Sequence, residues 1–395
     1  MPPHSPTTAH SRLKSHADLS RSSFECVALL LQGGGALGAY QAGVYEALAE
    51  AGLHPDWVAG ISIGAINSAV IAGNPPEARV DRLREFWETI TKPPAFAWNG
   101  QLRGLANGDT ARELVNQMSA GLALVAGASQ FFAPRLPQPW LLPAGTLAAT
   151  SYYDTSDLKR TLERVIDFDR INAGDTRLSV GAVNVGTGNF AYFDTITHTI
   201  RPEHVMASGA LPPGFPAVEI DGQRYWDGGL VSNTPLQWVV DSEPGRDTLA
   251  FQVDLWSAHG AFPRNLAEVE TRRKEIAFSS RTRAGTNSFE RTRSFRRAAR
   301  GLVEKLPDGL KDSPEAELLR SMGCDKVYNI VHLIYRAQNY EGQSKDYEFS
   351  RASMREHWRA GYHDATRTLR HPEVLQRPCN ASGVFTFDLG RDGRE

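Results

Sequence analysis

The chain has 395 residues, 41% of them hydrophobic, which is enough to bury a large core and is typical of a globular protein. Its 43 basic and 45 acidic residues nearly cancel, so the overall charge gives no indication of a nucleic-acid partner. No stretch approaches the roughly 18 uninterrupted apolar residues of a membrane span, so we expect any membrane contact to be peripheral. The three cysteines are far apart, which argues against a disulfide framework or a zinc site and favours a cytoplasmic protein: Cys26, Cys324 and Cys379.

An apolar run near the N-terminus leads directly into a glycine-rich loop. Val27–Leu31 is typical of a buried parallel strand, and Gly33–Gly38 follows it. Apolar residues then recur at helical spacing up to Gly52, and Trp57 begins a second strand. This order predicts a right-handed α/β unit whose loops emerge at the carboxyl edge of a parallel sheet.

The second predicted strand ends in Gly60-Ile61-Ser62-Ile63-Gly64, and helix-compatible residues follow. A strand, a sharp turn and a helix form the context of a nucleophile elbow, in which the turn exposes a serine and helix amides face developing negative charge. Small residues on both sides of the serine leave room for the tight junction. We therefore identify Ser62 as the candidate nucleophile, with Gly60 and Gly64 as its support.

The glycine loop has two interpretations. Gly33, Gly35 and Gly38 fit the G-x-G-x-x-G pattern of a dinucleotide site, but that pattern expects an acidic residue at the end of the next strand, and Asp56 precedes the strand. In the other interpretation the loop is an oxyanion hole. Its backbone N–H groups would then hydrogen-bond the negatively charged oxygen that develops when a serine attacks an ester.

Two later segments are less regular. Residues 93–150 are apolar, proline-rich and aromatic, and are either an insertion packed on the core or a cap that shapes an acyl pocket or contacts lipid. Residues 272–300 carry ten basic side chains against Glu275 and Glu290. Such a run is most simply a solvated helix face, and attraction to anionic lipid headgroups is the alternative.

A serine nucleophile needs a base that accepts its proton. The late histidines do not lie in small-residue loops after a strand, so we expect structural or exposed roles for His332, His357, His363 and His371. The tripeptide Asp227-Gly228-Gly229, taken alone, is most simply a turn.

Three blocks resemble, in the right order, the signature of the patatin-like phospholipases: Gly33–Gly38, Gly60–Gly64 and Asp227–Gly229. The resemblance covers roughly residues 26–253 and includes the small-residue and proline segment Ser208–Pro216. It implies a three-layer α/β/α fold and a lipid acyl hydrolase of phospholipase A type that uses a Ser-Asp dyad without histidine. Leu37 departs from the basic residue of many members, so backbone amides and the helix dipole would have to stabilise the oxyanion.

The resemblance also implies roles for individual residues. Ser62 would be the nucleophile and Asp227 the base, with Gly228 and Gly229 as support. Dry surroundings would make the Asp227 carboxylate basic enough for this role. No cofactor and no metal is implied, and the sequence contains no acidic calcium loop. The oxyanion hole would be formed by the loop Gly33, Gly34, Gly35, Ala36, Leu37 and Gly38.

These observations predict four segments. We expect a disordered tail over residues 1–24, a patatin-like domain over 25–255, a mostly helical C-terminal extension over 256–375 that completes the domain, and a second tail over 376–395. The extension resembles that of one bacterial patatin subgroup. The expected partner is an acyl-lipid or ester substrate and not a nucleic acid. A nucleotide-binding oxidoreductase and a non-catalytic lipid-binding module remain open as alternatives.

Overall fold

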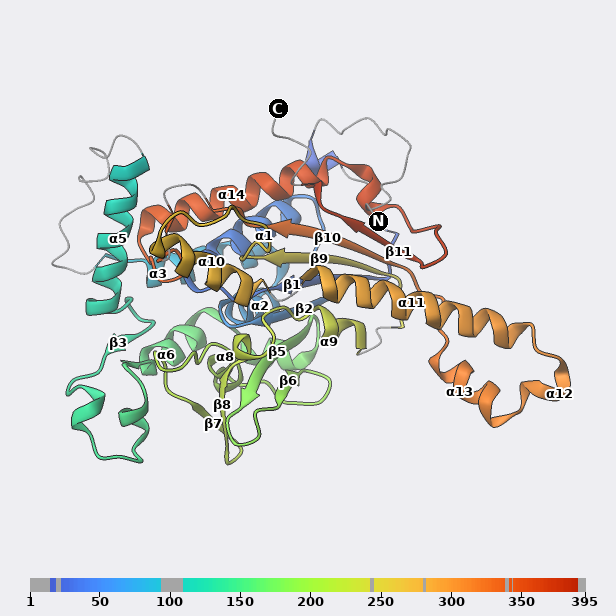
Figure 1. Ribbon diagram of the computed structural model, residues 1–395, viewed down its shortest axis with the longest axis horizontal. Helices are drawn as coiled ribbons and strands as arrows, with labels where there is room; N and C mark the ends of the chain where they lie inside the picture. Colours follow the sequence, from blue (N-terminus) through green and yellow to red (C-terminus); the bar gives the residue numbers. More distant parts are fainter. Residues whose placement is uncertain are drawn as a thin grey trace.

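The computed structural model describes residues 15–18, 23–93, 109–241, 245–279, 282–337, 341–342 and 344–389. At its centre is a nine-stranded sheet in the order β11-β10-β9-β1-β2-β5-β8-β7, with β6 also paired to β5 (Figure 1). Neighbouring strands from β11 to β5 run parallel, whereas β6 and β8 run antiparallel to β5. The strands of this sheet are β1 (Cys26–Leu31), β2 (Trp57–Ile61), β5 (Arg177–Asn184), β6 (Phe190–Asp194), β7 (Val218–Ile220), β8 (Gln223–Asp227), β9 (Thr248–Asp254), β10 (Tyr328–Ile334) and β11 (Val384–Phe387).

Helices cover both faces of the sheet, and a separate two-stranded pair joins β3 (Ala133–Pro134) to β4 (Tyr153–Asp154). The α-helices are α1 (Ala39–Glu50), α2 (Ile63–Ala72), α3 (Arg79–Ile90), α5 (Asp109–Ala126), α6 (Ser156–Val165), α7 (Phe168–Ala173), α8 (Pro202–Ser208), α9 (Leu236–Asp241), α10 (Leu266–Phe278), α11 (Thr282–Glu304), α12 (Asp308–Lys311), α13 (Pro314–Met322) and α14 (Arg351–Leu369).

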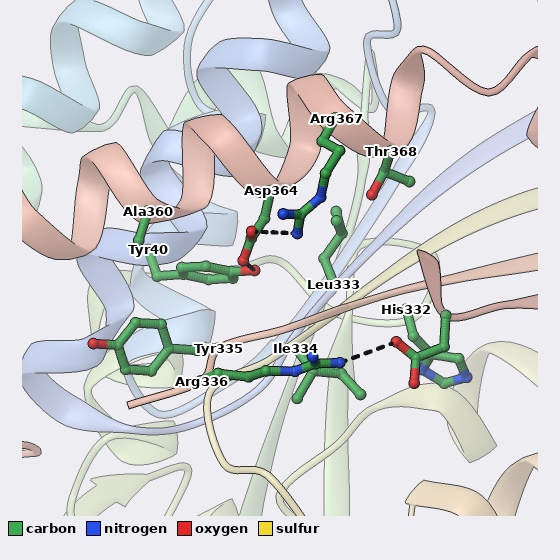
Figure 2. Close-up of a pocket in the computed structure, with 11 residues that line it drawn as sticks. Tyr40, His332, Leu333, Ile334, Tyr335, Arg336, Ala360, Asp364, Arg367 and Thr368 are labelled. Atoms are coloured by element: carbon green, nitrogen blue, oxygen red, sulfur yellow. Dashed lines mark hydrogen bonds and ion pairs between the residues drawn. The ribbon is translucent and has the colours of Figure 1, made fainter. Parts of the chain in front are cut away.

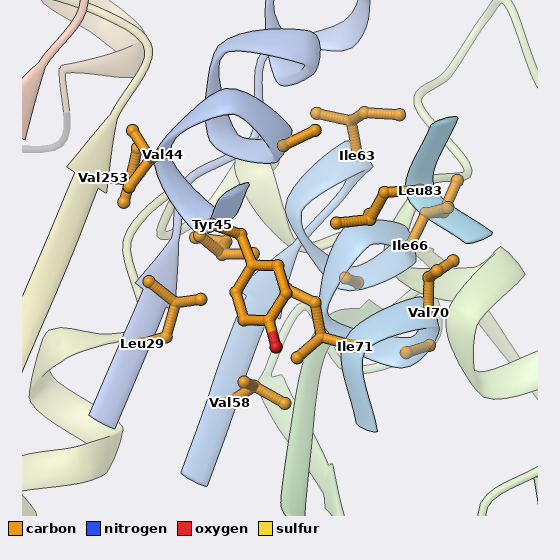
Figure 3. Packing of buried hydrophobic residues seen from close by; sticks show 14 of the residues in the cluster. Leu29, Val44, Tyr45, Val58, Ile63, Ile66, Val70, Ile71, Leu83 and Val253 are labelled. Atoms are coloured by element: carbon orange, nitrogen blue, oxygen red, sulfur yellow. The ribbon is translucent and has the colours of Figure 1, made fainter. Parts of the chain in front are cut away.

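The central strands are apolar on both faces, as strands covered on both sides require. Along β1, Leu29 and Leu31 pack into the cluster formed with α1, α2, α3 and α14, whereas Ala28 and Leu30 pack with residues of α9 and α11. Figure 3 shows the larger cluster, in which Leu29 of β1 lies near side chains of the helices above it. The predicted three-layer α/β/α fold is therefore confirmed.

The C-terminal extension belongs to the same core. Its strand β10 pairs with β9 of the patatin-like part, and its helix α14 packs along α1. The two helices cross at glycines: a Cβ on Gly43 would overlap the carbonyl oxygen of Trp358, and one on Gly361 would overlap that of Tyr40. Such close backbone contact is available only to glycine.

Both predicted tails contain ordered contacts. Residues 376–395 were expected as a tail, but β11 extends the sheet by pairing in parallel with β10 from Tyr328 to Val331. Within the predicted N-terminal tail, His16 Nε2 lies 2.8 Å from Glu50 Oε2 and Phe24 is buried in the core. The C-terminal segment therefore contributes a strand that its short length did not predict. Residues 1–14, 19–22 and 390–395 lie outside the described part, so the two tails stay predictions there.

Of the insertion predicted at 93–150, the structure describes residue 93 and residues 109–150. One part of it packs on the core, and another part is exposed to solvent. Phe131 and Phe132 are buried and form edge contacts with Phe349 of the extension. Trp140 and Leu141 are exposed. The first pair fits the interpretation of an insertion packed on the core.

The basic run at 272–300 is divided between α10 and α11. Arg293 is only 2% exposed, and its guanidinium lies 4.6 Å from the ring centroid of Tyr328. Arg297 donates a hydrogen bond to the Asp325 carbonyl at 2.9 Å. Part of this run is therefore structural rather than a solvated face. In the described residues, no helix has the length and apolar content needed to span a membrane.

Candidate active site

Ser62 lies at the junction between β2 and α2, at the carboxyl edge of the sheet. Its backbone has φ 56° and ψ −125°, a left-handed conformation that is strained for a residue with a side chain. Gly60 and Gly64 permit this turn, because a Cβ on Gly60 would overlap the Gly64 carbonyl and one on Gly64 would overlap the Leu31 carbonyl. This is the geometry of a nucleophile elbow.

A second serine holds the strained turn in place. The Ser62 N–H donates to Ser208 Oγ at 3.0 Å, and Ser208 Oγ in turn donates to the Gly181 carbonyl of β5 at 2.6 Å. Ser208 is the last residue of α8 and is fully buried. The sequence indicates Ser208–Pro216 only as a small-residue and proline segment that resembles one in the patatin-like enzymes, and it does not predict the supporting role of Ser208.

Asp227 ends β8 and faces the elbow from the neighbouring part of the sheet. The carboxylate is 2% exposed and accepts the Gly229 N–H at 2.7 Å. The Ser62 side chain lies close enough to this carboxylate to affect its pKa. Burial raises the pKa of Asp227 from 3.8 to about 7, although the Ser62 hydroxyl and the Gly229 N–H act in the opposite direction. Asp227 thus combines contact with Ser62 and unusual basicity.

Gly228 explains how the Asp227 turn approaches the elbow so closely. A Cβ on Gly228 would lie 2.6 Å from the Gly181 carbonyl and 3.1 Å from a methyl carbon of Ile61, the residue before Ser62. The first distance is too short for a side chain, and the second is tight. Gly228 therefore lets the turn pack directly on β5 and β2.

The glycine loop lies directly beside Ser62. A Cβ on Gly33 would be 3.0 Å from the Ser62 Cβ. Within the described residues, no acceptor is hydrogen-bonded to the N–H of Gly34 or Gly35. By contrast, Ala36 N–H donates to the Asp346 carbonyl at 2.8 Å and Leu37 N–H to the Gly34 carbonyl at 3.2 Å.

Within the predicted oxyanion loop, Gly33 to Gly38, the backbone N–H groups of Gly34 and Gly35 are therefore the two donors available to an oxyanion. Leu37 is fully buried in the core. It occupies the position that is often basic in the family that the chain resembles. The N-terminus of α2 also points its first amides toward the elbow, because α2 begins at Ile63. Charge stabilisation at this site would therefore come from backbone amides.

Two buried amide side chains connect the site loops and were not predicted. Asn233 Nδ2 donates to the Gly33 carbonyl and to the Phe278 carbonyl, both at 3.0 Å. Gln32, at the end of β1, donates to the same Phe278 carbonyl at 3.1 Å and to Thr234 Oγ1 at 3.0 Å. The end of α10 is thereby attached to the glycine loop and to the segment after Asp227.

Other candidate residues lie elsewhere. Asp56 is occupied at the start of β2, where its carboxylate accepts the Val27 N–H at 2.8 Å, so it is not placed to bind a ribose beside the glycine loop. In the described part of the chain, no histidine hydrogen-bonds to Ser62 or Asp227, and His357 pairs with Glu341 at 2.9 Å. No cluster of three metal-ligating side chains occurs among the described residues.

Figure 2 shows a cavity of about 100 Å³ between β10 and α14. It is lined by polar side chains such as Tyr40, Arg336 and Asp364, and ion pairs join Arg336 to Asp388 and Arg367 to Asp364. None of its lining residues belongs to the glycine loop, the elbow or the Asp227 turn. This cavity is therefore distinct from the candidate active site.

The sheet, the elbow and the buried carboxylate define an α/β protein whose candidate site lies at the carboxyl edge of a mostly parallel sheet. A family model described as "Patatin-like phospholipase" matches residues 29–239, more than half of the 395 residues, and one described as "Patatin phospholipase" matches residues 276–381. The chain belongs to the patatin-like phospholipase family, a family of lipid acyl hydrolases. The predicted family and its C-terminal extension are confirmed.

Comparison with solved structures finds VipD from Legionella pneumophila, at 17% sequence identity and a TM-score of 0.40. The match covers 92% of this chain and 71% of the VipD chain. Among curated proteins, none matches.

Proposed function

We propose that the protein is a serine acyl-ester hydrolase in which Ser62 is the nucleophile and Asp227 the base. Asp227 removes the Ser62 hydroxyl proton as Oγ attacks the carbonyl carbon of an acyl ester. The Gly34 and Gly35 N–H groups and the N-terminus of α2 stabilise the resulting oxyanion. Asp227 then returns the proton to the leaving alcohol, which leaves an acyl group on Ser62.

In the second half of the reaction, water takes the place of the Ser62 hydroxyl as the attacking group. Asp227 accepts a proton from water as the water oxygen attacks the acyl-enzyme, and collapse of the intermediate releases the carboxylic acid and restores the Ser62 hydroxyl. The observation that carries the proposal is the contact between the strained Ser62 and a buried carboxylate whose pKa is raised to about 7. Family membership supports an acyl lipid as the substrate.

The direct test compares hydrolysis of a soluble p-nitrophenyl ester and of phospholipid vesicles by wild type and Ser62→Ala. We expect kcat/KM to fall by about 10⁴-fold or more with both substrates, because a covalent nucleophile is removed. Ser68→Ala is a matched control, since Ser68 is buried in α2, the helix that follows Ser62, and its hydroxyl has no hydrogen-bond partner among the described residues. Ester hydrolysis that survives in Ser62→Ala would refute the proposal.

The raised pKa of Asp227 predicts the pH dependence. Only the ionised carboxylate accepts the Ser62 proton, so kcat/KM is expected to increase about tenfold per pH unit below the pKa and to level off above it. The midpoint should lie near pH 7, because burial raises the Asp227 pKa to about 7. A profile measured with a non-ionising ester from pH 5 to 9 tests this; activity that remains constant down to pH 5 would contradict the assignment.

A further inference from the structure

The C-terminal extension reaches the glycine loop through a turn at residues 344–347. The backbone carbonyl of Asp346 in this turn accepts the Ala36 N–H at 2.8 Å. The same carbonyl lies so close to Gly35 that a Cβ there would overlap it, and Gly35 has φ 55°. The conformation of the glycine loop is therefore matched to the position of one carbonyl in the extension.

The Asp346 side chain is held on the other side by α10. Lys274 Nζ lies 3.0 Å from both carboxylate oxygens of Asp346, and the two side chains are only 28% and 21% exposed. The Lys274 ammonium also lies over the ring of Tyr347, the next residue of the turn, 5.1 Å from its centroid. A partly buried, bidentate ion pair restricts motion more than an exposed pair does.

A second ion pair joins the same two elements. Lys345 Nζ, which is nearly buried, lies 2.7 Å from Glu275 Oε1 and 5.2 Å from the centroid of the Trp256 ring. Two adjacent residues of α10, a lysine and a glutamate, thus form ion pairs with two adjacent residues of the turn, an aspartate and a lysine. This arrangement fixes the register of the turn against the helix.

The C-terminal end of α10 forms hydrogen bonds with residues of the candidate active site. Its Phe278 carbonyl accepts hydrogen bonds from Asn233 and Gln32, and Asn233 also donates to the Gly33 carbonyl. The glycine loop is therefore held at Gly33 from one side and at Ala36 from the other. Between these two points lie Gly34 and Gly35, whose N–H groups have no acceptor among the described residues.

We propose that the C-terminal extension positions the oxyanion hole: the Asp346 carbonyl fixes the glycine loop, and Lys274 holds Asp346 in place. Asp346 and Lys274 are positioning residues that act through Ala36 and Gly35 and do not touch the substrate. The proposal rests on the proposed hydrolase function and adds to it a role for the extension. A donor displaced by a fraction of an ångström stabilises the oxyanion poorly, so the chemical step depends on this contact.

The test measures kcat and KM of Lys274→Ala and Asp346→Ala with a soluble ester, per active site titrated with a fluorophosphonate, so that unfolded protein does not enter kcat. We expect kcat to fall about tenfold in each variant with KM nearly unchanged, since the interaction acts on the transition state. The exchange Lys274→Asp/Asp346→Lys should recover most of the lost kcat. Arg273→Ala is the matched control, because Arg273 pairs with Glu270 on the exposed side of the same helix.

The outcomes are distinguishable. If both single variants keep wild-type kcat while Ser62→Ala is inactive, the extension does not position the loop, but the hydrolase function stands. If kcat falls equally in Arg273→Ala, or does not recover in the exchanged pair, the effect is not specific to the ion pair and the inference is wrong. If Ser62→Ala retains activity, the proposed function itself fails.

Discussion

Replacement of Asp227 by asparagine is expected to lower kcat/KM by about 10⁴-fold, the size of effect seen when a buried acid in a catalytic dyad or triad loses its charge. The asparagine amide has nearly the same shape, and its oxygen can still accept the Gly229 N–H that now bonds Asp227 at 2.7 Å. It cannot take up the Ser62 proton. The variant should therefore fold normally and bind ester without hydrolysing it.

The same substitution should increase stability at alkaline pH. The Asp227 pKa is about 7 in the folded protein and 3.8 for the unperturbed group, so the folded state holds more protons between these values and the free energy of unfolding decreases with increasing pH across this window. Above pH 7 the wild type carries the full cost of a buried carboxylate, which the asparagine variant lacks.

Thermal unfolding of both proteins at pH 8 and pH 4 measures this difference. We expect a higher Tm for Asp227→Asn at pH 8 and nearly equal values at pH 4. Activity close to wild type, or a lower Tm at pH 8, would contradict a buried, basic Asp227. Glu219→Gln serves as a control, because Glu219 is an exposed carboxylate in the neighbouring strand β7.

The second large effect is expected on the free energy of unfolding. Gly43→Val would place a branched side chain where α1 meets the backbone of Trp358 in α14, so the two helices would have to separate. We expect the free energy of unfolding to decrease by about 3 kcal/mol, the upper part of the range for overpacked cores. Urea unfolding followed by circular dichroism measures this loss.

Gly301→Ala in α11 is the matched control, because no atom of the described part of the chain lies within 4 Å of a Cβ at that helical position. It should leave stability unchanged or increase it by up to about 1 kcal/mol. If Gly43→Val unfolds at the same urea concentration as wild type, α14 does not pack on α1 as described. In that case α14 would not be part of the core.

The main elements of the fold could be predicted because their signals are local. An apolar run, three glycines and a helical period identify β1, the glycine loop and α1 without knowledge of distant residues. The elbow is similar, since Gly60 and Gly64 are required by a backbone turn that is complete within a few residues. Resemblance to a family was needed to connect Asp227 with Ser62.

The supporting residues could not be predicted, for a physical reason. Ser208, Asn233 and Asp346 act through one or two hydrogen bonds to backbone groups far away in the sequence, and their own neighbourhoods have no distinctive pattern. In Asp346 the acting group is a main-chain carbonyl, which every residue possesses. The strand β11 was missed because its four residues are too few to establish a period.

The central claim is that Ser62 and Asp227 work as one unit, and peptide mass spectrometry after brief exposure to a fluorophosphonate tests it most directly. We expect one adduct, on the peptide that contains Ser62, formed rapidly in wild type at pH 8 and at least about 100-fold more slowly in Asp227→Asn. An adduct on another residue, or equal rates of Ser62 labelling in the two proteins, would contradict it.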